Sequence, residues 1–270
     1  MERLIVLGTG AASAVRRYNT CSVLEGPEGR LLIDGGGGNG ILPRLEDAGV
    51  KLEELRSVFV THEHIDHLLG VLWVIRISAT RWLAGRRAEP LTVYCHANLA
   101  RKIAEICRLT LSAKQQAAIG EGVLLKPVAA GETYSIEGHR VTFFDIESKK
   151  AEQYGFRMEA PDGQVIVFCG DEPFRGKDVS ILRRADWLLH EAFCVERDAA
   201  VFNPHAIGHS TAAEAAAFAA EAGAHNLVLW HTEEKTGDAR RALYKEEASS
   251  FFAGCVHVPE DMEVIALKQA

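Results

Sequence analysis

Seven consecutive residues, Thr61-His62-Glu63-His64-Ile65-Asp66-His67, bring three imidazole groups and a carboxylate close together in the sequence. These side chains are ligands of borderline and hard divalent ions. In an extended segment His62 and His64 point to the same side and can share one ion, while Asp66 and His67 enter a following helix and can face a second ion. The spacing is not the H-E-x-x-H pattern of zinc proteases, because Asp66 stands where the second histidine would be. The segment therefore predicts part of a metal site and favours a two-metal hydrolytic centre.

Other residues that could bind metal come directly after apolar strands. Asp34 follows one such run, Asp171 another and His231 a third, and His62 stands in the same relation to its own strand. Open α/β sheets place ligands at the carboxyl ends of their strands, so we expect the four segments to converge on one pocket. The expected strands are Leu4–Leu7, Leu31–Asp34, Ser57–Val60, Leu91–Tyr94, Val141–Ile146, Gln164–Cys169, Trp187–His190 and Leu227–Trp230.

Helical patterns alternate with these strands, which favours an α/β fold with helices on the faces of the sheets. The segment Ala212–Ala222 is nearly all alanine and glutamate, and Thr211 with Glu214 fits a capping box at its start. His209 therefore lies just before a helix. We find no long linker, charge block or repeat, and treat residues 1–270 as a single domain.

Composition excludes several classes of protein. A formal charge of −7 argues against a globally basic nucleic-acid binder. The six cysteines are scattered without a C-x-x-C pair, and we expect them to be reduced thiols in the cytoplasm. The first apolar run is too short for a signal peptide, and no stretch approaches the roughly 20 apolar residues of a membrane span.

The residues His62, His64, Asp66 and His67 match H-x-H-x-D-H, so the chain resembles the metallo-β-lactamase superfamily. The similarity extends to Leu7-Gly8-Thr9-Gly10, Ile33-Asp34-Gly35-Gly36-Gly37, Gly170-Asp171 and Trp230-His231-Thr232. It implies a four-layer αβ/βα sandwich with the site at one edge of its two sheets. It also implies that His62 and His64 bind metal one, that Asp66, His67 and His231 bind metal two, and that Asp171 bridges both. Asp34 would then fix a ligand histidine from the second shell of the site.

Two later segments, Leu189-His190-Glu191-Ala192-Phe193 and Gly208-His209-Ser210-Thr211, are similar to motifs of the ribonuclease Z group. The resemblance implies three catalytic residues. Asp66 would orient the attacking hydroxide, and Glu191 would pair with His209, which stabilises the phosphate or protonates the leaving oxygen. The alternative is that His209 only starts a helix and Glu191 is a structural partner.

The chain departs from the family pattern at metal one. Family members supply a third histidine from a mid-chain strand, and here that position falls on Glu147. A carboxylate can also ligate zinc, although it would favour harder ions such as manganese or iron. We therefore expect two divalent ions, zinc first, with Glu147 as a ligand. The rival expectation is that metal one is weakly held or absent.

The second departure concerns the substrate. Ribonuclease Z enzymes that process transfer RNA carry a long arm between the mid-chain histidine and the bridging aspartate. Between Glu147 and Asp171 this chain has room for little more than two strands and the turn Pro161-Asp162-Gly163. We therefore expect a phosphodiesterase without that arm, acting on RNA ends, nucleotides or a small phosphodiester, and by resemblance a homodimer.

Three alternatives stay open. The first is a hydrolase of carboxylic esters, lactones or thioesters. The second is an iron oxidoreductase, suggested by the harder ligand Glu147. The third is a binding protein with a degenerate metal site.

Overall fold

The computed structural model describes residues 2–26 and 28–267, and its strands form two seven-stranded sheets. The first sheet has, in spatial order, β14 (Val264–Leu267), β1 (Glu2–Gly8), β2 (Cys21–Glu25), β3 (Arg30–Ile33), β4 (Ser57–Phe59), β5 (Leu91–His96) and β6 (Val123–Val128). The second has β13 (Cys255–His257), β12 (Asn226–Trp230), β11 (Trp187–Glu191), β10 (Val165–Phe168), β9 (Tyr154–Glu159), β8 (His139–Asp145) and β7 (Thr133–Ile136).

Each sheet is part parallel and part antiparallel. Strands β3 to β6 run parallel in the first sheet, and β10 to β13 run parallel in the second. The remaining pairs, which include β1 with β14 and β8 with β9, are antiparallel. The parallel strands end at common edges, so the residues that follow β3, β4, β10 and β12 can meet although they are far apart in sequence.

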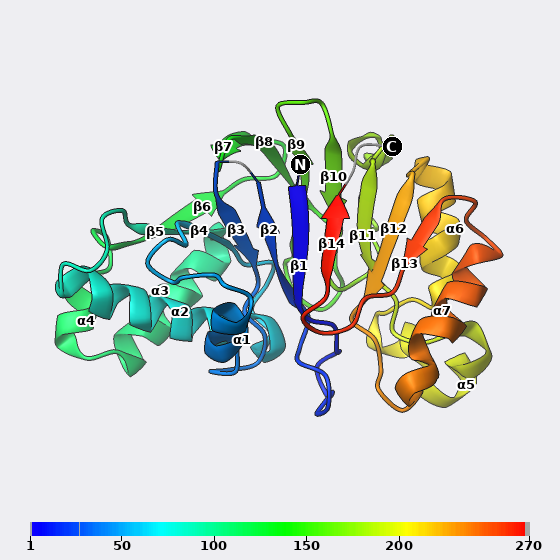
Figure 1. The fold of residues 1–270 in the computed structure, drawn as a ribbon, viewed down its shortest axis with the longest axis horizontal. Helices are drawn as coiled ribbons and strands as arrows, with labels where there is room; N and C mark the ends of the chain where they lie inside the picture. The colour runs from blue at the N-terminus through cyan, green and yellow to red at the C-terminus, as the bar shows by residue number, and fades with distance from the viewer. Residues whose placement is uncertain (1, 27, 268–270) are drawn as a thin grey trace.

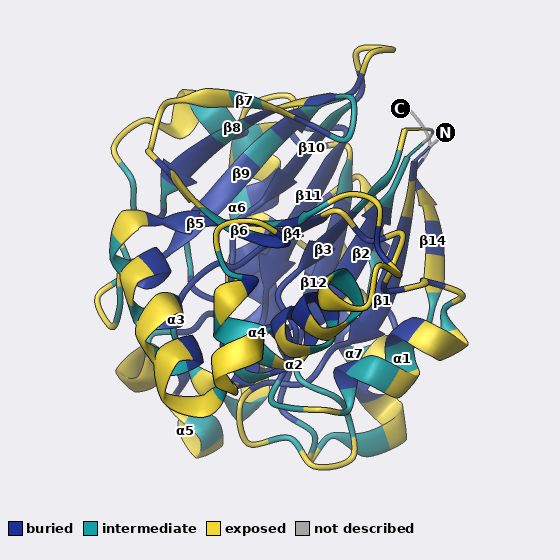
Figure 2. Ribbon diagram, turned by 90° about the vertical axis from the view of Figure 1, so that its left-hand side faces the viewer, coloured by how far each residue is buried: buried dark blue, intermediate teal, exposed yellow. Residues whose placement is uncertain are grey.

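Helices cover the outer faces of the two sheets, as Figure 1 shows on its left and right sides. They are α1 (Ile41–Asp47), α2 (Ile65–Leu83), α3 (Ala97–Thr110), α4 (Ala113–Ala117), α5 (Ala199–Phe202), α6 (Ala212–Ala222) and α7 (Arg240–Ser249). In Figure 2 buried strands lie between helices whose outward faces are exposed. The layers are helix, sheet, sheet and helix, which confirms the expected αβ/βα sandwich.

Alternation along the strands divides the core among the layers. On β3, Leu31 and Ile33 face the second sheet, while Leu32 packs with the helices of the first. On β11, Leu189 faces the inner layer and Leu188 packs under α6. Successive side chains of a strand point to opposite faces, so a strand covered on both sides must be apolar throughout. The inner layer joins both sheets through aromatic contacts such as Phe59 with Phe143, at 5.0 Å between ring centroids.

The eight expected strands all correspond to strands of the structure, and the expected helix Ala212–Ala222 is confirmed as α6 with its Thr211–Glu214 capping box. The strands β2, β6, β7, β9, β13 and β14 are not among the predicted ranges. They are short or carry polar residues, and β6 contains Lys126 and Pro127 at a sheet edge, where proline is tolerated. Between Glu147 and Asp171 the structure has only β9, β10 and their connections, which confirms the predicted lack of an arm.

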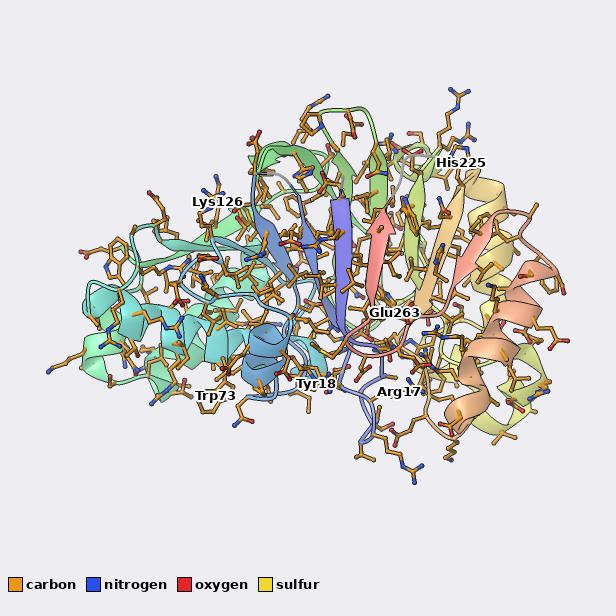
Figure 3. All side chains as sticks on the ribbon, viewed as in Figure 1. Arg17, Tyr18, Trp73, Lys126, His225 and Glu263 are labelled. Carbon is orange, nitrogen blue, oxygen red and sulfur yellow. The ribbon has the colours of Figure 1, made fainter. Side chains whose placement is uncertain are left out.

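The glycine run after β3 holds α2 against the first sheet. A Cβ atom on Gly70 of α2 would lie 1.8 Å from the Gly35 carbonyl oxygen, so only glycine allows this approach. The Gly35 amide donates to the His67 carbonyl, and the Gly70 amide donates to Gly36, each at 2.9 Å. The hydroxyl of Tyr18, labelled in Figure 3, lies 2.9 Å from the Gly35 carbonyl oxygen. These contacts fix the start of α2, where Asp66 and His67 lie.

Within residues 2–26 and 28–267, no helix is long and apolar enough to cross a membrane.

Candidate metal centre

The predicted metal motif spans the end of β4 and the start of α2. His62 is buried in the loop after the strand, and His64 occupies the N-cap position of the helix. Asp66 and His67 lie in the first helical turn and are both buried, as the sequence predicted. A carboxylate is also stabilised there by the partial positive charge of the helix N-terminus. The local structure therefore directs four donor side chains from one short segment toward the same edge of the sandwich.

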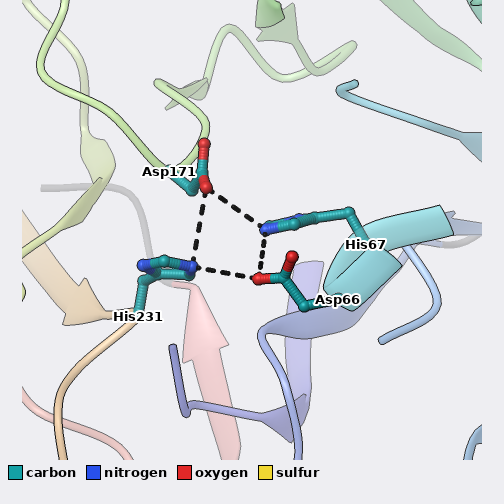
Figure 4. Close-up of side chains that lie close together, drawn as sticks. All are labelled: Asp66, His67, Asp171 and His231. Carbon is teal, nitrogen blue, oxygen red and sulfur yellow. Dashed lines mark ion pairs between the residues drawn. The ribbon is translucent and has the colours of Figure 1, made fainter. Parts of the chain in front are cut away.

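Four residues form a closed ring of donor atoms, which Figure 4 shows. They are Asp66, His67, Asp171 and His231. Nε2 of His67 lies 3.3 Å from Asp66 Oδ2 and 3.4 Å from Asp171 Oδ2, and Nε2 of His231 lies 3.5 Å from each of these oxygens. A tetrahedral site with ligand distances of about 2.0–2.1 Å separates its ligand atoms by about 3.3 Å. The ring therefore has the size that one divalent ion requires.

The imidazole nitrogens that face the ring lack hydrogen-bond partners. Nε2 of His67 and Nε2 of His231 are buried and make no hydrogen bond within the described residues. On the other side of the His67 ring, Nδ1 lies 2.7 Å from Asp34 Oδ2, so it must donate its proton to that carboxylate. The lone pair of neutral His67 is then on Nε2 and faces the ring. This contact confirms the expected role of Asp34 in fixing a ligand histidine.

Electrostatics at the ring also suit a cation. Burial by itself lowers the pKa of His67, but the carboxylates of Asp34, Asp171 and Asp66 outweigh it and hold this pKa well above its ordinary value. Burial by itself raises the pKa of the Asp171 carboxyl, but the histidines around it hold that pKa well below its usual range. Asp66 and Asp171 thus stay charged in a buried ring, and one divalent ion would balance their two negative charges.

A second, smaller group consists of His62, His64 and Asp171. Nε2 of His62 lies 2.8 Å from Nδ1 of His64 and 3.7 Å from Asp171 Oδ2. Two ligands of one ion lie about 3.3 Å apart. The distance between the two imidazole nitrogens is shorter than this, and the distance from His62 to Asp171 is slightly longer. The group can therefore hold an ion after a small separation of its two imidazoles, and it shares the Asp171 carboxylate with the ring.

Glu147 belongs to neither group, contrary to our expectation. Strand β8 ends at Asp145, and Glu147 takes a left-handed backbone conformation with φ 56°. Its amide donates to Asp145 Oδ1 at 2.8 Å, and the residue is exposed. This tight turn takes the chain away from the strand direction directly after Ile146. Our expectation required the strand to continue in the same direction as far as Glu147, and it does not.

Backbone strain marks two other strand ends at the site. Asp34 after β3 and His231 after β12 both have φ 56°. A residue other than glycine in the left-handed region is uncommon and costs free energy, which the surrounding structure must compensate. The two residues in this conformation are Asp34, whose carboxylate orients His67, and His231, whose imidazole completes the ring.

The structure brings Glu191 and His209 together beside the ring. Nδ1 of His209 lies 3.6 Å from Glu191 Oε2, longer than a hydrogen bond, while Glu191 Oε1 accepts from the Ser210 amide at 2.7 Å. The His209 ring stacks on Phe193 and lies 5.0 Å from the His231 ring. His209 is therefore held at the edge of the donor ring, with Glu191 buried behind it.

Three further residues of the site were not predicted. Lys150 Nζ lies 3.4 Å from His209 Nε2, and Arg175 pairs with buried Glu172 at 2.9 Å. Gln153 is buried and donates to Asp171 Oδ1. Lysine, arginine and glutamine are common surface residues, so their types and spacing gave no signal. Only the packing of the loop before β9 against the loop after β10 brings them to the centre.

Comparison with known proteins agrees with this geometry. A family model described as the Beta-lactamase superfamily domain matches residues 30–232. A ribonuclease Z of Pseudomonas putida (strain F1) is 26% identical over 321 aligned residues, covering 96% of this chain and 95% of that protein. A ribonuclease Z of Methanosarcina acetivorans is 28% identical over 295 residues, covering 93% and 94%.

Among solved structures, human tRNase Z, short form, superimposes with a TM-score of 0.75 at 22% identity. The superposition covers 98% of this chain and 99% of the human one. Its two-sheet sandwich matches the layers described above. The family model covers most of the chain, and the matched residues include every member of both donor groups. The chain belongs to the β-lactamase superfamily.

Proposed function

We propose that this protein is a metal-dependent phosphodiesterase. The observation that carries the proposal is the buried ring of Asp66, His67, Asp171 and His231, whose donor atoms have the spacing of one ion and whose two imidazole nitrogens lack hydrogen-bond partners. The curated relatives that the chain matches over nearly its full length are named ribonuclease Z, which supports a phosphodiester substrate.

Two divalent ions would complete the centre, with zinc proposed because the donor set is rich in imidazole. The ring would hold one ion, and His62 with His64 would hold the other, while Asp171 would be shared. When bound, such a pair of ions lowers the pKa of water and stabilises charge on a phosphate. Manganese and iron were expected only on account of Glu147, which lies outside both groups.

The catalytic roles proposed for Asp66, Glu191 and His209 follow from their positions. Asp66 would orient the attacking water through its carboxylate. His209, at the edge of the ring, would hold or donate a proton at the leaving oxygen, and Glu191 behind it would orient the imidazole. Lys150 beside His209 adds a positive charge that suits an anionic phosphate.

The substrate class that we propose is an RNA end, a nucleotide or a small phosphodiester. The segment between β8 and β10 has no long insertion with which to grip a large RNA. The aligned length of the Pseudomonas relative exceeds the length of this chain, so that relative contains residues that this chain lacks. A carboxylic ester is less favoured, because a neutral substrate would gain little from Lys150 and Arg175. An iron oxidoreductase and a degenerate binding site are not favoured either, since the relatives are hydrolases and the ring of donors is complete.

We further propose that the whole chain, residues 1–270, acts as one hydrolase domain, supported by the core that both sheets share. A cytoplasmic location is supported by the free cysteine thiols among the described residues.

We also propose that the protein forms a homodimer, which light scattering would test. The exposed apolar side chains of Ile65, Trp73 and Leu109 offer surface for one.

A substrate panel tests the main proposal. The protein is stripped of metal, supplied with zinc, manganese or iron(II) individually, and assayed with bis-(p-nitrophenyl) phosphate beside p-nitrophenyl acetate and a thioester. We expect metal-dependent turnover of the phosphodiester. Turnover of the esters alone would overturn the choice of substrate, and a coloured iron protein inactive on all of them would favour the oxidoreductase.

His209→Ala tests the role of the imidazole. We expect a loss of about 10²–10⁴-fold in kcat on a dinucleotide, whose alkoxide leaving group needs a proton, and a much smaller loss on bis-(p-nitrophenyl) phosphate. His205→Ala is the matched control, because His205 is exposed and pairs with Glu214 at 2.9 Å. Equal losses of His209→Ala on both substrates would contradict proton transfer by His209.

A further inference from the structure

Gln153 is a buried amide whose two ends are in different situations. It is 1% exposed, and its Nε2 donates to Asp171 Oδ1. A carboxylate can only accept hydrogen bonds, so the NH₂ end of the amide must be the end that faces Asp171. The carbonyl oxygen Oε1 is therefore the other end, and it is buried without a hydrogen-bond partner among the described residues.

The contact with Gln153 determines which oxygen of Asp171 faces the ions. Oδ1 is held by Gln153, and Oδ2 is the oxygen that lies 3.4–3.7 Å from His62, His67 and His231. Figure 4 shows one Asp171 oxygen facing His67 and His231 and the other turned away from the ring. Gln153 thus orients the one carboxylate that both donor groups share.

The backbone places Gln153 on the side of the first group. The amide of Tyr154, the next residue, donates to the carbonyl of Thr61 at 3.2 Å, and Thr61 directly precedes His62. The backbone carbonyl of Gln153 accepts from the Ile146 amide at 3.0 Å, and this hydrogen bond fixes the loop before β9. Gly170 leaves room for the amide, since a Cβ atom there would lie 2.6 Å from Gln153 Nε2. Three segments, at residues 61–62, 153–154 and 170–171, therefore meet at this point.

Within residues 2–26 and 28–267, the first group also lacks a fourth histidine, cysteine or acidic residue. It contains His62, His64 and Asp171, whereas the ring contains four residues. A neutral carbonyl oxygen is an acceptable ligand for divalent ions, and it adds no further negative charge beside Asp171. An unpartnered buried carbonyl costs free energy, which a cation beside it would recover.

We propose that Gln153 is the fourth protein residue of the first metal site. Its Nε2 holds Asp171 with Oδ2 toward the ions, and its Oε1 is the oxygen offered to the ion that His62 and His64 bind. This inference rests on the proposed two-metal centre. It gives the first site a donor from a separate segment, the loop before β9, in the role that Glu147 was expected to have.

Metal binding by Gln153→Leu tests the proposal without reliance on activity. Leucine has a similar volume but neither donates nor ligates. We expect the variant to bind one Zn²⁺ about 10–100-fold more weakly, the usual effect of losing a supporting group at a metal site, and the other with a clearly smaller loss, because the ring keeps its three other ligands. Stoichiometry is measured by elemental analysis after dialysis against buffered Zn²⁺, and affinities by Co²⁺ titration followed through its visible absorbance.

Gln164→Leu is the matched control. Gln164 is equally buried but donates to the Leu267 carbonyl, far from the metal groups in the fold. It should bind two ions with parent affinities. Should Gln153→Leu not fold, Gln153→His serves instead, and its imidazole should tighten the first ion. Unchanged binding of both ions by the Leu or the His variant would overturn the inference, as would equal loss of both ions. If the parent itself binds only one ion, the two-metal proposal fails first, and the two failures are thus distinguished.

Discussion

The two donor groups share Asp171 but are built differently. The ring takes Asp66 and His67 from α2, Asp171 from the end of β10 and His231 from the end of β12. Its neighbouring donor atoms are 3.3–3.5 Å apart. The first group takes His62 and His64 from one segment, and its donor distances are 2.8 Å and 3.7 Å. The ring has the geometry of a bound ion, and the first group does not yet have it.

The difference shows what positions a metal ligand. The side chains of the ring come from three different elements, α2 and the ends of β10 and β12, and those elements are packed against one another, so the ring stays open. His62 and His64 come from the same short segment, and their imidazole nitrogens lie 2.8 Å apart. Preorganised ligands bind with less rearrangement, so we expect the ion of the ring to bind more tightly than the ion of the first group.

The largest effect should come from Asp171, the residue on which both groups depend. Asp171→Ala should lose both ions, and activity should fall by on the order of 10³-fold or more, because the lowered pKa of water and the stabilisation of phosphate charge both depend on the ions. Metal content and kcat are measured together. If the variant keeps one tightly bound ion, the two groups do not both depend on Asp171.

Asp34→Asn should separate the two groups. Asparagine is neutral and has one acceptor oxygen where the Asp34 carboxylate uses two, so its hold on His67 Nδ1, now at 2.7 Å, is weaker and the ring should bind its ion about 10–100-fold more weakly. Thr61→Val is the complementary change, because the Thr61 hydroxyl lies 2.8 Å from His62 Nδ1 and supports the first group. We expect it to weaken the first ion more than the ion of the ring, which the Thr61 hydroxyl supports only indirectly, by donating to Asp34 Oδ2 at 2.9 Å. Equal effects of both variants on both ions, measured by Co²⁺ titration, would argue against two distinct groups.

Glu147→Ala should have the smallest effect. Glu147 is exposed and outside both groups, so metal stoichiometry and metal identity should stay as in the parent protein. The measurement is elemental analysis of the two purified proteins. Loss of one ion from the variant would restore Glu147 as a ligand and would require the loop before β9 to rearrange when metal binds.

Much of the site was predictable because its residues follow simple local patterns. The strands before Asp34, His62, Asp171 and His231 are continuous apolar runs, and such runs predict buried parallel strands that end at one edge. The start of α2 at the metal motif and the capping box of α6 are equally local. The role of Asp34 could be predicted because it follows an apolar strand that ends at the same edge as the metal motif, where carboxylates commonly fix ligand histidines.

The rest could not be predicted, because it depends on contacts between distant segments. Nothing in the residues around Gln153 distinguishes it from an ordinary surface glutamine, and it becomes part of the centre only where the loop before β9 meets Asp171. Glu147 failed as a prediction for a related reason. Its spacing suggested the end of a strand, but the left-handed turn at that residue was not visible in the local pattern.

The sequence by itself determined which chemical groups stand at the strand ends, and therefore that a cluster able to bind metal lies at the edge of an α/β sandwich. Only the tertiary structure decided which of these groups meet, and at what distance. The physical reason is that a strand pattern specifies burial and the alternation of faces, whereas the distance between His67 and His231 depends on how two sheets and α2 pack. That packing spaces the donor atoms of the ring for one ion and leaves the imidazoles of His62 and His64 close together. It also brings Gln153 to Asp171, the carboxylate that both groups share.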